Sequence, residues 1–163
     1  MLCQALLALT VPVCPLSSYS KPFELAFLLR QSCVTRLFVS PALLALACAA
    51  AKEVGLPDDC ILILEGSAPN RKNLADLIDG VVARQTPAVG VRSVERDTLA
   101  YLLFSSGTSG LPKAVMVSHD NLVFQLVQAE MTSQESLAIS IVSRECLEHF
   151  GKGTHYFLTA AAA

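Results

Sequence analysis

Hydrophobic residues in this chain come in short runs that alternate between helical and extended character. An Ala/Leu-rich run at 41–55 begins with proline and ends with glycine, which is typical of a complete helix. The run at 60–65 is continuously apolar, as in a strand buried on both faces of a parallel sheet. We expect helices at 2–9, 22–32, 41–55, 70–80 and from Ser118 onward, and strands at 10–14, 35–40, 60–65, 98–104 and 114–118. This alternation predicts an α/β fold, with a partial, mainly parallel sheet and flanking helices.

The stretch from Leu99 to Leu122 carries the candidate chemistry, because a loop of small residues lies there between two apolar runs that we expect to be core strands. The small or turn-forming residues are Ser105, Ser106, Gly107, Thr108, Ser109, Gly110 and Pro112. Glycine lets backbone amides approach a ligand closely, and a run of such amides forms a concave site for anions. Lys113 adds a positive charge suited to a terminal phosphate. These residues predict a site for a nucleoside triphosphate rather than a surface linker.

The loop is not the P-loop of GxxxxGK[ST] enzymes. Counting from Gly107, Pro112 stands where that motif has glycine, and Ala114 replaces its Ser or Thr. The residues after the loop also predict a strand, where a P-loop leads into a helix.

The segment YLLFSSGTSGLPKAVMVSHDNL resembles the phosphate-loop signature of the adenylate-forming superfamily, which includes acyl-CoA synthetases and 4-coumarate–CoA ligases. The resemblance implies that the loop binds the β- and γ-phosphates of ATP during carboxylate adenylation. It implies these ATP contacts: Ser105, Ser106, Gly107, Thr108, Ser109, Gly110 and Lys113. Lys113 is also the candidate catalytic residue, because its charge would oppose that of the leaving pyrophosphate. Ala114 departs from the glycine that is usual in the family.

The resemblance extends from about residue 4 to residue 131, so we expect a partial AMP-binding domain at 1–131. Residues 132–163 stay unassigned, and their GKGT at 151–154 is interpreted as a plain loop. The family's Tyr-Gly-x-Thr-Glu segment, whose Glu holds Mg²⁺, is not found in this sequence. We therefore expect ATP as the ligand, with Mg²⁺ and coenzyme A used only by the intact family. A truncated or misread gene product is one explanation of the change in character near Met131.

Composition limits the partners of the chain. The sequence has 163 residues, of which 53% are hydrophobic, and its formal net charge of −2 suggests neither nucleic acid nor an anionic membrane as a partner. No apolar run is long enough for a transmembrane helix. An incomplete sheet would expose apolar surface, so a partner that covers such a face is expected.

Cysteine usage favours a reduced, cytoplasmic chain. The six cysteines show no C-x-x-C spacing, and several lie in apolar elements where a thiol acts as a small hydrophobe. The apolar N-terminus lacks the basic residues of a signal peptide, and the chain does not end in Ser-Lys-Leu. We predict no metal site.

The other candidate residues favour structural roles. His119 lies at the start of an expected helix, and we interpret it as a residue that packs there rather than as a catalytic group. The pairs Asp58/Asp59 and Asp76/Asp79 are interpreted as solvated caps and helix faces.

Three hypotheses about function remain at this point. The first is a fragment of an ATP-dependent carboxylate-activating ligase, inactive alone. The second is a non-catalytic nucleotide-binding or protein-interaction module. The third is a small secreted protein with disulfides, which a count of six thiols would exclude.

Overall fold

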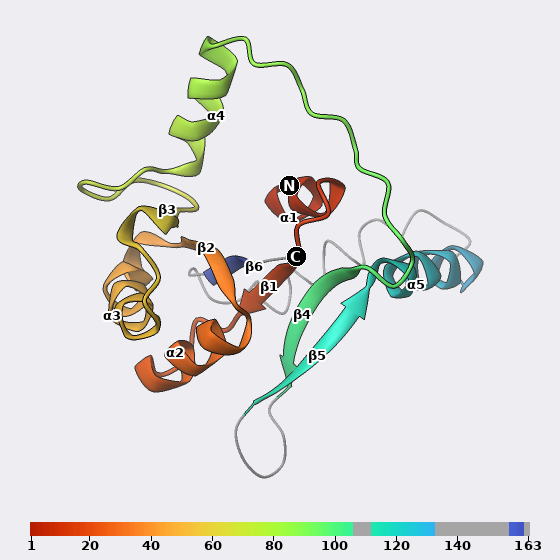
Figure 1. The fold of residues 1–163 in the computed structure, drawn as a ribbon, viewed down its shortest axis with the longest axis horizontal. Helices are drawn as coiled ribbons and strands as arrows, with labels where there is room; N and C mark the ends of the chain where they lie inside the picture. Colours follow the sequence, from red (N-terminus) through yellow and green to blue (C-terminus); the bar gives the residue numbers. More distant parts are fainter. Residues whose placement is uncertain (106–111, 133–156, 162–163) are drawn as a thin grey trace.

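A computed structural model describes residues 1–105, 112–132 and 157–161 of the chain. The described part contains a six-stranded sheet with helices packed against it (Figure 1). The elements in chain order are α1 (Leu2–Ala8), β1 (Val13–Leu16), α2 (Pro22–Gln31), β2 (Val34–Val39), η1 (Pro41–Leu43), α3 (Leu44–Val54), η2 (Asp58–Cys60), β3 (Ile61–Ile63), α4 (Leu74–Ala83), β4 (Leu99–Ser105), β5 (Lys113–Ser118), α5 (His119–Thr132) and β6 (Phe157–Ala161). The predicted α/β class is confirmed.

The sheet is mixed, but four of its strands run in the same direction. The strand order is β3-β2-β6-β1-β4-β5. β1 pairs parallel with β4, and β2 pairs parallel with β3. β6 runs antiparallel to both β1 and β2, so those two strands share one direction. The carboxyl ends of β1 to β4 therefore meet at one edge, where α/β proteins bind ligands.

The core lies on both faces of the sheet. Cys14 belongs to the larger cluster, with Leu25 of α2, Ala47 of α3 and Leu37 of β2. The neighbouring Val13 belongs instead to a smaller cluster, with Ala100 and Tyr101 of β4 and with partly buried side chains of α1 and α5. Adjacent strand residues point to opposite faces, so α2 and α3 cover one face and α1 and α5 the other.

The helix signals in the sequence are largely confirmed. α2 begins at Pro22, and the backbone N–H of Lys21 donates to the Glu24 carboxylate over 2.8 Å. The run predicted as one helix at 41–55 starts as the short 3-10 turn η1 and continues as α3. Gly55 ends it in the left-handed conformation, at φ +76°. Only glycine adopts that conformation without strain.

Three strand predictions need correction. The strand expected at 10–14 begins at Val13 and continues through Pro15, because residues 9–11 close the end of α1 with backbone hydrogen bonds. The strand expected at 60–65 is only Ile61–Ile63. The second apolar strand of the candidate site, β5, is an exposed edge strand and not a core strand, with Met116 74% exposed.

The C-terminal segment holds a strand that the sequence did not predict. Residues 132–163 were unassigned, yet Phe157–Ala161 form β6 in the middle of the sheet. The apolar residues of this strand gave no helical or alternating pattern, and its place depends on partners far away in the sequence.

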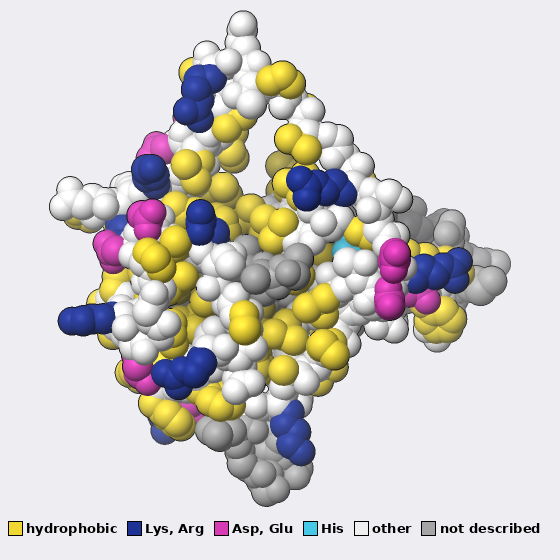
Figure 2. All heavy atoms as spheres, viewed as in Figure 1, with side chains coloured by type: hydrophobic (Ala, Val, Ile, Leu, Met, Phe, Trp, Pro, Cys, Tyr) yellow, Lys and Arg dark blue, Asp and Glu magenta, His cyan; other side chains and the backbone are white. Residues whose placement is uncertain are grey.

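Apolar side chains are exposed on several of the described elements. α4 projects from the body of the molecule in Figure 1, and no side chain in this helix is buried. Ile78 and Val82 of α4 are 53% and 69% exposed, and Figure 2 shows hydrophobic side chains on this part of the surface. In the described ranges, no helix combines the length and hydrophobicity that crossing a bilayer requires.

Candidate functional site

Ser105 and Lys113 mark the two ends of the candidate phosphate loop. β4 and β5 form an antiparallel hairpin in which Ser105, the last residue of β4, pairs with Lys113, the first residue of β5. Both side chains are exposed. The predicted contacts Ser106, Gly107, Thr108, Ser109 and Gly110 lie outside the described residues. Within the described residues, the hairpin therefore places the Ser105 hydroxyl beside the Lys113 ammonium group, where the loop begins and ends.

Strand alternation assigns these two residues to one face of the sheet. Residues two apart on a strand share a face, so Ser105 lies on the face of Tyr101, and its partner Lys113 lies on the face of Val117. Tyr101 and Val117 belong to the smaller core cluster, together with Leu122 of α5. The hydroxyl and the ammonium group are therefore on the α1/α5 face.

The base of the hairpin is held by backbone hydrogen bonds. The N–H of His119 donates to the carbonyl of Thr98 over 2.9 Å, and the N–H of Asp120 donates to the carbonyl of Arg96 over 2.8 Å. One irregularity in the ladder lies between Leu99 and Tyr101, where β4 has one more residue than β5. This β-bulge at Ala100 increases the local twist and shifts the pairing toward the loop by one residue.

His119 is at the wrong end of the hairpin for nucleotide contact. It follows the last residue of β5, whereas Lys113 is the first, and β5 alone, from Lys113 to Ser118, is about 17 Å long at 3.4 Å per residue. Its Nε2 is buried without a hydrogen-bond partner in the part of the chain that the structure describes. This position supports the helix-start role that we expected.

The hollow of about 430 Å³ in the described surface is separate from the loop. It is lined by residues from the ends of α2 and α3 and the start of β2, including Arg30, Arg36 and Gly55. β2 begins there, so the hollow opens at the amino edge of the parallel strands, opposite the edge from which the loop leaves β4. Because the hollow is open and lies at the opposite edge of the sheet, it is not part of the candidate nucleotide site.

Comparison with known proteins decides the family. The model of the AMP-binding enzyme family matches residues 1–144. The chain belongs to the AMP-binding enzyme family. The match covers the whole hairpin and continues beyond Met131, where the resemblance in the sequence ended.

Two of the similar proteins are an acyl-CoA synthetase and a fatty-acid–CoA ligase by name. A protein of Emericella nidulans whose name describes an acyl-coenzyme A synthetase is 35% identical over 69% of this chain and 21% of its own length. The medium-chain fatty-acid–CoA ligase of Escherichia coli K12 is 28% identical over 74% of this chain and 21% of its own length. The chain thus spans about a fifth of these two relatives. A long-chain-fatty-acid–CoA ligase structure from Archaeoglobus fulgidus shares the fold, with a TM-score of 0.66, 23% identity, and coverage of 78% of this chain and 24% of that one.

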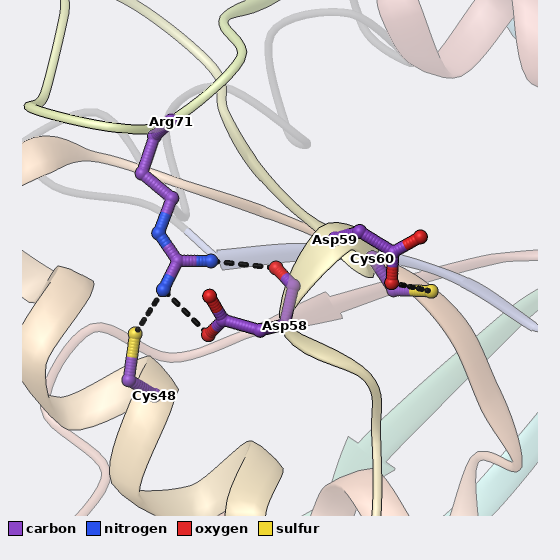
Figure 3. Close-up of polar contacts among 5 residues, drawn as sticks. All are labelled: Cys48, Asp58, Asp59, Cys60 and Arg71. Carbon is purple, nitrogen blue, oxygen red and sulfur yellow. Dashed lines mark hydrogen bonds and ion pairs between the residues drawn. The ribbon is translucent and has the colours of Figure 1, made fainter.

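The sequence did not reveal a polar cluster around Arg71. Its guanidinium donates to the carbonyl and the carboxylate of Asp58, and to the Cys48 Sγ over 3.3 Å (Figure 3). The hydrogen bond that Arg71 donates to the Asp58 carboxylate raises the pKa of Arg71, against the opposing effect of burial. Asp58 lies in the first turn of η2 with its side chain 76% exposed, as expected for a solvated cap, and its carboxylate also binds a side chain 13 residues away that no local pattern indicates.

The Arg71 cluster is structural in position. It joins α3, η2 and the segment before α4; η2 leads into β3, which lies at the opposite end of the strand order from β5. Among the residues described, no three His, Cys, Asp or Glu side chains gather as metal ligands would.

Proposed function

We propose that this chain supplies the ATP phosphate-binding loop of a carboxylate-activating ligase that forms an acyl-adenylate and then an acyl-CoA. The observation that carries the proposal is the pairing of Ser105 with Lys113 at the ends of a Ser/Gly-rich loop, in a chain of the AMP-binding enzyme family. The carboxyl edge from which this loop leaves β4 is also where open α/β sheets bind their ligands.

Each loop residue has a role in this proposal. In the first step a carboxylate oxygen attacks the α-phosphorus of ATP, and the bond to the β-phosphate breaks to release pyrophosphate. Lys113 would oppose the negative charge that builds up on the leaving pyrophosphate, which is a form of electrostatic stabilisation. Backbone amides and hydroxyls would hold the β- and γ-phosphates from these positions: Ser105, Ser106, Gly107, Thr108, Ser109 and Gly110.

The described residues fit a phosphate group better than they fit Mg²⁺. The exposed ammonium group of Lys113 beside the Ser105 hydroxyl suits a phosphate oxygen. For Mg²⁺, no group of three His, Cys, Asp or Glu side chains is found in the described ranges. We therefore assign neither Mg²⁺ nor coenzyme A to a residue of this chain.

We further propose that residues 1–131 form the partial AMP-binding domain and that the isolated chain has no turnover. The chain spans only about a fifth of the relatives named above. The test is pyrophosphate release by the purified chain with ATP, Mg²⁺ and a panel of carboxylic acids. We expect no release above that of a Lys113→Ala control, and a carboxylate-dependent signal would overturn this part of the proposal.

A second candidate is a non-catalytic nucleotide-binding or interaction module. The exposed apolar residues of α4 and β5 favour it, because a partner could cover them. Co-purification of the chain with one partner at fixed stoichiometry would favour this module over the ligase fragment.

We also propose a cytoplasmic, reduced chain. Cys60 is buried beside Arg36, and Cys48 contacts Arg71, so both thiols have structural surroundings that a disulfide would disturb. Titration of the unfolded chain should find six thiols without reductant, and a lower count would favour the secreted alternative.

A further inference from the structure

β6 fills a slot between β1 and β2, which run in the same direction and do not pair with each other in the described sheet (Figure 1). One edge of β6 pairs with Val13–Leu16 of β1, and the other pairs with β2 between Val34 and Val39. Neighbouring strands lie about 4.8 Å apart, so the slot has the width of one extended segment. Both walls are far from β6 in the sequence, so backbone pairing rather than a short connection holds β6 in the slot.

Pro15 limits the pairing of β1 with its other neighbour, β4. All residues of β1, Val13–Leu16, have partners in β6, so that ladder continues through the proline. A proline has no N–H to donate, so a continuous ladder requires the nitrogen of Pro15 to point away from β6 and toward β4. Within the described residues, β1 pairs with β4 at one position, Val13 with Tyr101, before the ladder reaches Pro15. β6 is therefore the main backbone partner of β1.

Helix packing holds the two walls of the slot in place. α2 connects β1 to β2 along the chain, and its Leu25 and Leu29 belong to the same buried cluster as Leu16 of β1 and Leu37 of β2. A helix that connects two parallel strands packs on a face of the sheet, so it leaves the strand edges that face each other open to a third strand. The segment from β1 to β2 thus builds both walls, and β6 supplies the strand between them.

We propose that the slot between β1 and β2 is a recognition site for an extended peptide segment. Its ligand is the sequence Phe157–Ala161, whether this segment comes from the same chain or from a separate molecule. The backbone N–H and C=O groups of both walls provide the recognition, as in β-strand addition. The bound segment runs antiparallel to both walls, with Thr159 between Cys14 and Leu37. This inference does not depend on nucleotide binding.

Thr159→Pro in the full chain should empty the slot. Because Pro15 cannot donate to β6, its neighbours in β1 make the hydrogen bonds of this ladder, and one of them, Cys14, stands opposite Thr159. A proline at position 159 removes the donor at the centre of the segment and is excluded from the interior of a sheet.

The probe is a fluorescent peptide with the sequence of residues 155–163, and fluorescence anisotropy measures its binding. We expect saturable binding of one peptide to each Thr159→Pro chain. The unaltered chain should bind the peptide at least about tenfold more weakly, because its own segment competes for the slot. The matched control is the same peptide with Thr159→Pro, which should bind neither chain.

A cysteine in the peptide identifies where it binds. The Thr159→Cys peptide should form a disulfide with Cys14 of the chain, since directly opposite residues have Cα atoms about 5.5 Å apart, within the range that a disulfide spans. The Ala160→Cys peptide is the control, because residue 160 lies on the opposite face of the sheet from Cys14 and should not link to it. Peptide mass mapping distinguishes Cys14 from the other cysteines.

The outcomes decide the proposal. A peptide that binds both chains equally overturns the inference, as does a folded Thr159→Pro chain that binds no peptide or binds it without a link to Cys14. If circular dichroism shows that Thr159→Pro does not fold, the unaltered chain is refolded from urea with excess Thr159→Cys peptide, so that the two segments compete for the slot. A link to Cys14 then supports the site, and its absence overturns it. A failure of ATP binding leaves these outcomes unchanged.

Discussion

Ser105 and Lys113 stand directly opposite each other in the β4–β5 ladder, one on each side of the candidate phosphate loop. Directly opposite residues of an antiparallel pair have Cβ atoms about 4.5–5.5 Å apart and share a face. A hydroxyl and a mobile cation can therefore reach the same phosphate group, and the hairpin rather than a helix N-terminus presents them.

Arg71→Met should destabilise the fold by about 2 kcal/mol, since hydrogen bonds to charged groups contribute roughly 1.5–3 kcal/mol each and the Arg71 side chain is only 14% exposed. Arg30→Met is the matched control. Its ion pair with Glu53 spans 3.7 Å between side chains that are more than half exposed, so the loss should be below about 1 kcal/mol. Urea unfolding measures both, and equal losses would contradict the structural role of the Arg71 cluster.

The same cluster predicts how stability depends on pH. Asp58 raises the pKa of Arg71, so the contribution of this group is fully present below the ordinary arginine pKa and is lost only as pH rises through the raised value. The difference in unfolding free energy between the unaltered chain and Arg71→Met should therefore stay constant between pH 7 and pH 9. A steady decline over that range would mean that another group controls the interaction.

Gly55→Ala should cost about 1 kcal/mol or more, because Gly55 adopts φ +76° and a left-handed conformation costs a non-glycine residue roughly 1–2 kcal/mol. An added Cβ meets no atom within 4 Å, so the cost is conformational and not steric. Gly90→Ala is the control, since its surroundings are equally open and its φ is not in the left-handed range. Thermal unfolding should show a loss for Gly55→Ala alone. Similar melting temperatures for the two variants would contradict this explanation.

Local signals predicted much of the fold, and long-range pairing determined what they missed. Pro22, Pro41 and Gly55 mark helix ends through φ restrictions that act within one or two residues, and the helices begin or end there. The prediction that β5 is a buried core strand was wrong, because an apolar sequence does not reveal whether a neighbouring strand covers it. The Arg71–Asp58 contact was missed for the same reason, since it depends on how two loops approach in space. Ser105 and Lys113 were predicted as site residues, and the structure places them opposite each other. Their role in binding ATP stays a prediction.

His119→Leu should raise the free energy of unfolding by about 1 kcal/mol, because it removes a buried Nε2 that has no partner in the described part of the chain. His119→Gln keeps a polar group at the position and should give no such gain. Chemical denaturation measures the free energy of unfolding of both variants and of the unaltered chain. A loss of stability in His119→Leu would show that the imidazole makes an interaction essential to the start of α5.

ATP binding by the purified chain, measured by calorimetry, tests the central claim most directly. The account predicts saturable binding at one site per chain, abolished by Lys113→Ala and by Gly107→Val and retained by Lys52→Ala, which removes an exposed lysine of α3. Circular dichroism should show that all four proteins are folded. A folded chain that binds no ATP, or a Lys113→Ala variant that binds as tightly as the unaltered chain, would contradict the assignment of the β4–β5 loop as a phosphate site.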